Sequence, residues 1–366
     1  MSISASSTVL AERRRHLGIL TLNRPKALNA LSLEMIRALT AQLLSWRHDD
    51  EVGAVLLRGA NREGKAPAFC AGGDIRYFHQ AALAGDPTLE DFFSEEYALN
   101  HLIHSFGKPT FVLMDGITMG GGMGLAQGCS MRVVTEHARL AMPETNIGLF
   151  PDVGGGWFLA RTPGCLGEFL GLSGQVLGAA DALAVDWADI CVKADRLDEL
   201  VQGIVDATAV DGVGALSAVN AFAADAGASP LATQRDLVDR VFAAHDLPAI
   251  VAALAAEPGE FAASLASTLA QRSPLMMAVT LAQIRRARGM TLADDLRMER
   301  GLVRQCFHLR PGAASETLEG IRALAVDKDH APRWNPSTIE AVDAATVAAY
   351  FESPWPAHAH PLRDLA

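Results

Sequence analysis

Alternating apolar and polar stretches predict alternating strands and helices up to about residue 205. Residues 17–25 have a strand-like composition and end at a proline. Residues 31–50 repeat apolar side chains at helical spacing, which predicts a helix with one buried stripe. That stripe consists of Ile36, Leu39, Leu43 and Trp46. Residues 52–59 are almost entirely apolar, as is typical of a strand that is covered on both faces, so the three segments together predict a βαβ unit.

The same pattern returns further along the chain and then changes. Further strands are predicted at residues 109–116, 131–136, 138–142 and 188–192. Residues 205–272 are rich in alanine, aspartate and valine and contain no convincing strand, whereas residues 273–307 predict helices that open at a proline and break near Gly289. We therefore expect an α/β core over residues 1–205, a helical region over 206–345 packed on that core, and a tail over 346–366.

The composition limits the kinds of protein that the chain can be. It has 366 residues, of which 50% are apolar, and this is ample for a large core. The 31 Lys and Arg residues against 42 Asp and Glu residues give a net charge of −11. An acidic chain without a Lys/Arg tract is a poor candidate for binding nucleic acid, so an anionic ligand would need local basic groups or helix N-termini.

The cysteines and the first residues suggest a compartment. Five cysteines without a Cys-x-x-Cys spacing favour reduced thiols and give no sign of a zinc site. No apolar run approaches the roughly 18 residues of a membrane span, and the N-terminus lacks the apolar segment of a secretory signal. We expect a cytoplasmic protein with no membrane partner. The less favoured alternative is the mitochondrial matrix, because Arg13–Arg15 and the nearby serines faintly resemble a transit peptide.

Two glycine-rich segments each stand before a predicted helix. They are "FCAGGDIRYF" (69–78) and "MDGITMGGGMGLAQG" (114–128). Glycines at a helix start let a ligand approach the backbone, and the first-turn amides have no partner within the helix. Two such starts facing each other would form an oxyanion hole. The alternative is a pair of tight turns without a ligand; neither segment has the register of a dinucleotide or phosphate loop.

A pair of acids stands in "AMPETNIGLFPDVGGG" (141–156), where Glu144 and Asp152 each follow a proline. Their spacing is close to two helical turns, so a bent connection would bring the two carboxylates together. Apolar neighbours and mutual repulsion would raise the pKa of at least one of them, so that one acts as a base while the other holds a proton. The structural alternatives are a first-turn acid for Glu144 and a helix N-cap for Asp152.

Several segments together resemble the enoyl-CoA hydratase/isomerase (crotonase) superfamily. These are "TLNRPKALNALS", "FCAGGDI", "GITMGGGMGLA" and "AMPETNIGLFPDVGGGWFLAR". The pairing of MPE with FPDVGG, with "EEYALN" (95–100) and "EGIRALAVDKDHAPRW" (319–334), resembles the 3-hydroxyisobutyryl-CoA hydrolase branch. The resemblance covers roughly residues 8–335. It implies an α/β fold, a crotonase-like spiral of ββα turns with a helical C-terminal region, and an acyl-CoA thioester hydrolase of valine degradation.

The resemblance also implies roles for particular residues. The catalytic acids would be Glu144 and Asp152, with Glu96 and Gly121 also contacting the substrate. The oxyanion donors would be the backbone amides of Gly73 and Gly121. Coenzyme A would be contacted, largely by backbone, by Lys26, Ala27, Leu28, Ala71, Gly72, Gly73, Asp74 and Ile75. Coenzyme A is part of the substrate, so no separate cofactor and no metal are expected, and a homo-oligomer is compatible with the family.

Gly124 favours the hydrolase over its main alternative. Hydratases of the superfamily carry an acid at this position and a second one in the later PE motif, whereas this chain has only the second, Glu144. The alternatives are an enoyl-CoA hydratase or isomerase acting on another acyl-CoA, and a CoA-binding protein without chemistry. The residues alone also leave open Asp74 as a helix N-cap, Glu96 on a solvated helix face and Lys26 as a surface lysine. The sequence does not choose between Glu144 activating a water and attacking the carbonyl itself.

Overall fold

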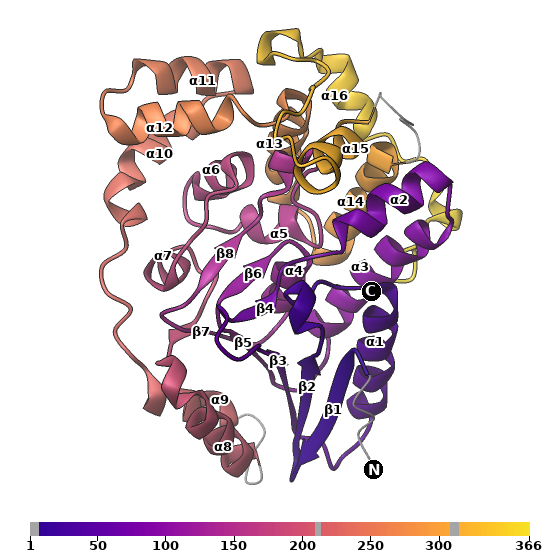
Figure 1. Ribbon diagram of the computed structural model, residues 1–366, viewed down its shortest axis with the longest axis vertical. Helices are drawn as coiled ribbons and strands as arrows, with labels where there is room; N and C mark the ends of the chain where they lie inside the picture. Colours follow the sequence, from indigo (N-terminus) through magenta and orange to yellow (C-terminus); the bar gives the residue numbers. More distant parts are fainter. Residues whose placement is uncertain (1–6, 209–213, 308–314) are drawn as a thin grey trace. The chain divides into compact units, whose positions relative to one another are not determined.

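The computed structural model of the chain describes residues 7–208, 214–307 and 315–366 (Figure 1). The chain forms two compact units, and each unit is assembled from separate stretches of sequence. The first unit comprises Met1–Gly73, Ala98–Ala141 and Val176–Ala232, and the second comprises Asp74–Tyr97, Met142–Gln175 and Thr233–Ala366. The expected division of the chain into residues 1–205, 206–345 and 346–366 stays a prediction.

The first unit is built on two β-sheets. The larger sheet has the order β1-β2-β3-β5-β7-β9 and the smaller one the order β4-β6-β8. Among the described strands, β1 alone runs antiparallel to its neighbour, and all other pairs are parallel. The strands are β1 (Val9–Arg14), β2 (Leu17–Leu22), β3 (Ala54–Gly59), β4 (Ala68–Cys70), β5 (Thr110–Met114), β6 (Ile117–Met119), β7 (Met131–Val134), β8 (Arg139–Ala141) and β9 (Ile190–Cys191).

The two sheets are filled in alternation along the chain. Strand β3 enters the larger sheet and β4 the smaller one, and the pairs β5–β6 and β7–β8 repeat this step. This repetition is the spiral of strand pairs that the resemblance implies. Residues 117–119, which the sequence presented only as part of a glycine loop, form β6, because a three-residue strand is defined by its neighbours β4 and β8 rather than by a period of its own.

Helices and turns complete the first unit. They are η1 (Pro25–Ala27), α1 (Leu33–Arg47), α4 (Gly121–Gln127), α7 (Ala179–Ala184), η3 (Ala194–Arg196), α8 (Leu197–Thr208), α9 (Gly214–Ala218) and η4 (Val219–Phe222). The predicted apolar stripe of α1 is buried, and the Ser32 side chain caps the helix by accepting a hydrogen bond from the amide of Met35. Residues of β2, β3, β5 and β7 pack with α8 and α9 in one hydrophobic cluster. The predicted βαβ start of the chain is therefore confirmed.

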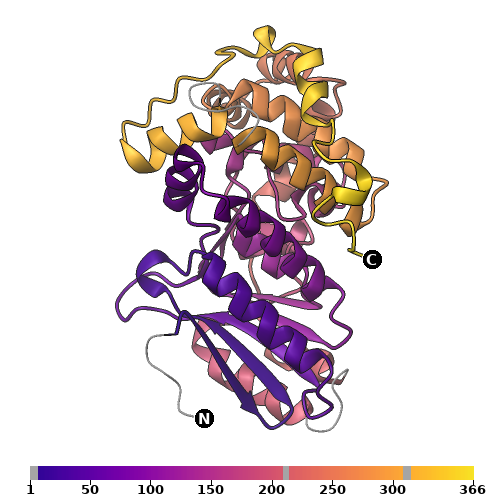
Figure 2. The ribbon, with the colours of Figure 1, turned by 90° about the vertical axis from the view of Figure 1, so that its right-hand side faces the viewer.

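The described residues of the second unit form helices and turns and contain no β-strand. Helix α3 (Thr88–His104) continues into the first unit, and η5 (Leu231–Gln234) begins there and ends in the second. Helix α15 (Glu316–Ile321) is extended by the π-helical turn η7 (Arg322–Val326). The other helices and turns are α2 (Ile75–Ala84), η2 (Glu144–Ile147), α5 (Gly155–Leu159), α6 (Leu166–Ser173), α10 (Arg235–Phe242), α11 (Leu247–Ala256), α12 (Glu260–Leu269), α13 (Pro274–Ala287), α14 (Leu292–Phe307), η8 (Ile339–Ala341), α16 (Ala344–Tyr350) and η9 (Ala357–Ala359). The orange and yellow C-terminal helices gather beside one another in both views (Figures 1 and 2).

Helices α13 and α14 form the interior of this second unit. Helix α13 packs on α5 and α6, and α14 packs on α5, α15 and α16. As predicted, α13 opens at a proline, and the Ser273 side chain caps it by accepting from the amide of Met276. The expected break near Gly289 separates α13 from α14. No helix in the described ranges is both long and apolar enough to cross a membrane.

The final residues, which were expected to be a tail, lie against α14. The Arg297 side chain on α14 donates to the carbonyl of Leu362 at 3.1 Å. The ring of His360 lies 3.1 Å from the carbonyl oxygen of Arg297, and Leu362 is buried. These contacts make residues 360–362 a packed part of the second unit.

Candidate active site

Glu96, Glu144 and Asp152 are buried together in the second unit. They come from α3, from η2 and from the turn before α5, and their exposed fractions are 2%, 6% and 6%. Burial, and after it repulsion from Asp152, raises the pKa of both glutamates well above the ordinary value, and Glu144 adds to the effect on Glu96. The fold therefore brings together the three acids that the resemblance assigns to the substrate site.

Glu144 is the first residue of η2, a short 3-10 turn that follows Pro143. Gly148 ends this turn in the left-handed region with φ of 66°, and the amide of Leu149 donates back to the carbonyl of Glu144 at 3.0 Å. The carboxylate oxygen Oε2 of Glu144 is buried and has no hydrogen-bond partner among the described residues. A buried polar atom left in this way is unusual, and it is suited to a proton, a water or a substrate group.

Asp152 is held by a tyrosine from a distant helix. The hydroxyl of Tyr97 on α3 donates to Oδ2 of Asp152 at 2.8 Å, and the tyrosine is fully buried. Burial raises the pKa of Asp152 from 3.8 to about 6, and the hydrogen bond from Tyr97 opposes this rise. Asp152 can therefore exchange a proton near neutral pH.

Two structural alternatives for these acids are wrong. Glu96 does not lie on a solvated helix face, because its side chain is among the most deeply buried acids of the unit. Asp152 does not cap the following helix, because α5 begins after Gly154 and has no side-chain cap from its own turn. For Glu144 the expected position at the start of a helical turn is correct, although the turn is a single 3-10 turn.

The turn of Glu144 rests closely on helix α15. A Cβ atom added at Gly148 would lie 2.2 Å from the carbonyl oxygen of Glu316, and one added at Gly320 would lie 2.3 Å from the carbonyl of Ile147. The hydroxyl of Thr317 donates to the carbonyl of Gly148 at 2.6 Å. Glycines at both positions are therefore required for the backbone of α15 to reach the turn that carries Glu144.

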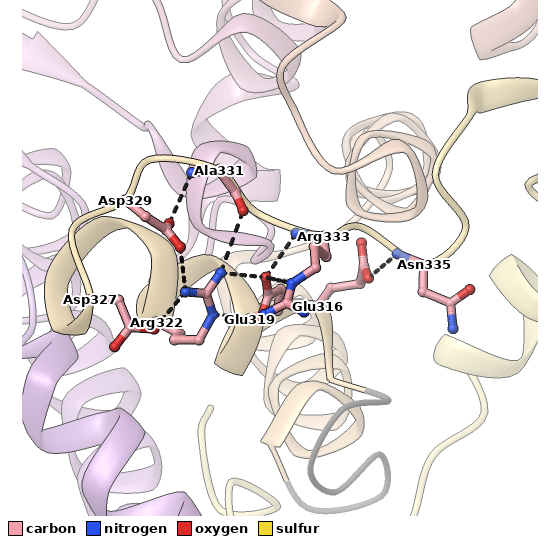
Figure 3. Close-up of polar contacts among 8 residues, drawn as sticks. All are labelled: Glu316, Glu319, Arg322, Asp327, Asp329, Ala331, Arg333 and Asn335. Carbon is pink, nitrogen blue, oxygen red and sulfur yellow. Dashed lines mark hydrogen bonds and ion pairs between the residues drawn. The ribbon is translucent and has the colours of Figure 1, made fainter.

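Hydrogen bonds and ion pairs join residues 327–335 to side chains of α15 and of Arg322 directly after it (Figure 3). The guanidinium of Arg322 donates to the carboxylates of Glu319, Asp327 and Asp329 at 2.6–2.9 Å. The Glu316 carboxylate accepts from the hydroxyl of Ser273 and from the amide of Asn335. The segment "EGIRALAVDKDHAPRW" is therefore bonded to the same helix, α15, on which the turn of Glu144 rests.

The expected oxyanion loops lie next to each other in the first unit. Gly72 has φ of +100°, and a Cβ atom added there would lie 3.5 Å from the amide nitrogen of Gly121. Gly121 is the first residue of α4, and Gly73 forms a bridge with Leu31. Gly121 lies in the first turn of α4, where backbone amides lack partners within the helix, as an oxyanion donor requires. The role of Gly73 and Gly121 stays a prediction.

The two segments expected to contact coenzyme A also meet in the first unit. The amide of Ala71 donates to the carbonyl of Leu28 at 3.0 Å, so residues 26–28 lie beside residues 71–73. Lys26, Ala27 and Leu28 are exposed. Asp74 and Ile75 belong to the second unit, where the Asp74 side chain caps α2 by accepting from the amide of Tyr77. The N-cap expectation for Asp74 is confirmed, and the contacts with coenzyme A stay a prediction.

Gly124 lies buried inside the right-handed helix α4. A positive φ is therefore not the reason for a glycine at this position, and the chain has no carboxylate where the superfamily's hydratases carry one. Within the described residues there is also no group of three His, Cys, Asp or Glu side chains that could hold a metal ion. The expectation that the enzyme uses no metal and no separate cofactor stays a prediction.

Tyr97, Gln283, Asp295 and Glu299 contribute to the site's surroundings, and the sequence patterns did not single them out. In the sequence, Tyr97 is marked only by its position directly after Glu96. Asp295 and Glu299 stand four residues apart on α14, on the face that also buries its apolar side chains. Two acids at helical spacing within an apolar stripe are a signal of buried carboxylates, because charged groups are rarely buried without a purpose.

The spiral of strand pairs, the paired glycine loops and the buried acids define an acyl-CoA enzyme of the crotonase fold. The family model described as Enoyl-CoA hydratase/isomerase matches residues 17–351, and the chain belongs to this family. The chain is 40% identical to the mitochondrial 3-hydroxyisobutyryl-CoA hydrolase of Danio rerio over 358 residues, which cover 96% of this chain and 91% of that protein. It is 39% identical to the protein of the same name from Xenopus tropicalis over 341 residues, covering 92% and 86%.

A solved structure is similar over almost the whole chain. The crystal structure of a protein named as a carnitinyl-CoA dehydratase, from Mycobacterium thermoresistibile, has a TM-score of 0.88 and 37% identity, covering 98% of this chain and 99% of that one. The curated relatives are named as mitochondrial, so the expected cytoplasmic location is wrong. The cysteine pattern did not separate the alternatives, because it indicates only a reducing compartment.

Proposed function

We propose that the protein hydrolyses 3-hydroxyisobutyryl-CoA to 3-hydroxyisobutyrate and coenzyme A, a step of valine degradation. It is an acyl-CoA thioester hydrolase. The observation that carries the proposal is the group of three buried acids, Glu96, Glu144 and Asp152, in a chain whose relatives are named 3-hydroxyisobutyryl-CoA hydrolases. The pKa of Asp152, raised by burial to about 6, lets it gain and lose a proton at the pH of a cell.

The acids take different roles in this reaction. Glu144 either activates a water for attack on the thioester carbonyl or attacks the carbonyl itself to form a mixed anhydride, which a water then hydrolyses. In both cases the C–S bond breaks and coenzyme A leaves as the thiol. Asp152, oriented by Tyr97, binds the 3-hydroxyl of the substrate or orients the water. Glu96 contributes a further polar group for the acyl end. The amides of Gly73 and Gly121 stabilise the oxyanion, and each such donor contributes about 3–4 kcal/mol to the transition state.

Two further points belong to the proposal. Coenzyme A is contacted by residues 26–28 and 71–75, and the exposed ammonium of Lys26 is available to a phosphate. Lys26→Ala should then raise KM for the CoA ester without a matching loss of kcat. The protein assembles as a homo-oligomer, which sedimentation of the purified full chain tests directly; a single monomer peak would contradict this part.

The reaction is tested by supplying two CoA esters separately. With a thiol reagent present, 3-hydroxyisobutyryl-CoA should yield free coenzyme A, and crotonyl-CoA should show no loss of enoyl absorbance. The reverse pattern would contradict the hydrolase. Glu144→Gln should lower the release of coenzyme A by at least about 10²-fold, the lower end for loss of a general base. Equal release by wild type and variant would show that Glu144 does not carry the reaction.

A second candidate is an enzyme that adds or removes water at a carbon–carbon double bond. It is favoured by one observation, since the similar solved structure is that of a protein named as a carnitinyl-CoA dehydratase. The absence of an acid at Gly124 in α4 argues against it. The crotonyl-CoA arm of the experiment decides between the two.

A further inference from the structure

The turn that carries Asp152 is bound by three buried side chains for which the proposed reaction gives no role. Asp295 and Glu299 project from α14, and Gln283 projects from α13. All three are fully buried. They lie in the second unit with Asp152 and Tyr97.

These side chains bind the backbone on both sides of Asp152. Glu299 accepts from the amide of Gly154 at 2.7 Å through Oε2, and from the amide of Gly156 at 2.9 Å through Oε1. Asp295 accepts from the amide of Trp157 at 2.8 Å through Oδ2. Gln283 donates from Nε2 to the carbonyl of Pro151 at 2.7 Å and to Oε1 of Glu299 at 2.9 Å. Helix α5 is thus capped by carboxylates of a different helix.

The backbone between these anchors is strained. Val153, directly after Asp152, has φ of +58°, which a β-branched residue rarely adopts. Such a conformation costs roughly 1–3 kcal/mol and persists only where the surroundings enforce it. Gly154 continues in the left-handed region with φ of +86°. The bonds to Gly154, Gly156 and Trp157 are the interactions that enforce this path.

The same anchors explain the run of glycines after Asp152. A Cβ atom added at Gly156 would lie 2.4 Å from Oδ1 of Asp295, and one added at Gly154 would lie 2.9 Å from a methyl carbon of Leu292. The backbone must be bare here so that α14 can approach its amides. Gly156 has ordinary helical backbone in α5, so its conformation does not require a glycine. The close approach of Asp295 does.

Holding this turn with Asp295 and Glu299 has a free-energy cost, because both carboxylic acids are removed from water. Burial, and after it the charge of the neighbouring Asp295, raises the pKa of Glu299 well above its ordinary value, and burial raises that of Asp295 to about 6. Hydrogen bonds with Glu299 and with the amide of Trp157, and after them the charge of Arg161, favour the ionised form of Asp295. Replacing buried charges by apolar residues is often neutral or stabilising, so packing alone does not account for two acids here. Burial, and after it the charges of Asp152 and Glu299, raises the pKa of Tyr97, whose hydroxyl donates to Asp152 at 2.8 Å.

We propose that Glu299 and Asp295 are positioning residues for the reaction: they fix the left-handed turn at Val153 so that the Asp152 carboxylate meets the hydroxyl of Tyr97 and the 3-hydroxyl of the substrate. The identity of that substrate rests on the proposed function; the positioning of Asp152 does not. Neither residue touches the substrate. Both act through the backbone of residues 153–157.

Glu299→Gln tests this proposal, because the amide keeps the shape of the side chain but offers one acceptor oxygen to two backbone amides. A misplaced catalytic group costs up to about 100-fold, so we expect kcat to fall by about 10–100-fold with KM changed less than about threefold. The ratio of kcat/KM for 3-hydroxyisobutyryl-CoA to that for isobutyryl-CoA should also fall. Asp295→Asn, which keeps an acceptor for the amide of Trp157, should show the same pattern more weakly.

Glu168→Gln is the matched control. Glu168 is a similarly buried carboxylate of the second unit, on α6, and its ion pairs are with the side chains of Arg288 and Arg285 rather than with the backbone after Asp152. The Glu168→Gln variant should have a lower melting temperature, and its kcat and substrate preference when folded should equal those of the wild type.

Wild-type kcat and wild-type substrate preference in both Glu299→Gln and Asp295→Asn would overturn the proposal. If Glu299→Gln does not fold, Asp295→Asn compared with Glu168→Gln decides by the same two measurements. Failure of the wild type to release coenzyme A would instead contradict the proposed function.

Discussion

A substitution of Tyr97 can change the pKa of Asp152 while the Asp152 side chain itself stays in place. Its hydroxyl donates to the ionised form of Asp152 and so lowers a pKa that burial raises to about 6. Tyr97→Phe removes this donor, and we expect the pKa of Asp152 to rise. If Asp152 must be ionised, the acidic limb of the profile of kcat/KM against pH will move to higher pH.

Tyr77→Phe is the control for this change. The Tyr77 hydroxyl is bonded to Thr88 and contacts none of the three acids. Its pH profile should match that of the wild type. An unmoved acidic limb in Tyr97→Phe would show that Asp152 does not titrate in the free enzyme between about pH 5 and 7.

Asp152 itself should decide whether the enzyme distinguishes a hydroxylated acyl group from a plain one. A site built to hydrogen-bond a hydroxyl rejects the analogue without it far more strongly than an apolar site does. Asp152→Asn should therefore lower turnover and reduce the ratio of kcat/KM for 3-hydroxyisobutyryl-CoA over isobutyryl-CoA. The ratio is measured with the same thiol assay for both proteins. An unchanged ratio would exclude Asp152 from reading the hydroxyl.

At the level of elements, the contact between η2 and α15 should control both stability and turnover. Gly320→Ala places a methyl group where the carbonyl of Ile147 already lies, at 2.3 Å, so that η2 must shift. Overpacking of this kind costs roughly 1–3 kcal/mol in the free energy of unfolding. We expect a lower urea midpoint and, because Glu144 moves with η2, a loss of kcat.

Gly289→Ala is the matched change at a glycine in the loop before α14, where a methyl group meets nothing within 4 Å. It should leave the urea midpoint and kcat nearly unchanged. Wild-type turnover in a folded Gly320→Ala protein would mean that the turn of Glu144 does not depend on α15 for its position.

At the scale of the whole protein, its buried acids should make stability depend on pH in an unusual direction. Burial raises the pKa values of Asp152 and Asp295 from 3.8 to about 6, and it raises those of Glu96, Glu144 and Glu299 well above the ordinary value of a glutamate. An acid with a raised folded pKa stabilises the protein fully below its unfolded pKa and loses that stabilisation as the pH rises through the folded value. A tenfold difference in proton affinity between the folded and unfolded states corresponds to about 1.4 kcal/mol.

We therefore expect the melting temperature to fall between about pH 5 and pH 7.5. Below about pH 4 the opposite trend should set in, because Glu319 and Asp329 are bonded to Arg322, which lowers their pKa values. Asp295→Asn should flatten the fall above pH 5 by removing one of the titrating groups. Melting curves of both proteins across this range provide the measurement; a wild-type melting temperature that rises steadily to pH 7.5 would contradict the expectation.

The sequence by itself determined those features that local interactions set. The stripe of α1, its Ser32 cap, the opening of α13 at Pro274 and the cap at Asp74 all depend on residues within a turn or two of each other. Periodicity and capping report such contacts directly. The motifs around Glu144 and Asp152 identified the family and the two acids. The tertiary structure supplied the reason for the bend between them, since Gly148 must lie against the backbone of Glu316.

Only the tertiary structure decided which polar side chains are buried and what they contact. Glu96 lies in a polar run beside Glu95, and nothing in that run distinguishes the buried acid from its neighbour. Tyr97 meets Asp152 across 55 positions of sequence, and Glu299 caps Gly154 across 145. Burial and long-range hydrogen bonds depend on which helix faces pack together, and this choice minimises the exposed apolar surface of the entire unit rather than of any one segment. A single sequence therefore reveals the acids, and the packing of α3, α13 and α14 sets their proton affinities.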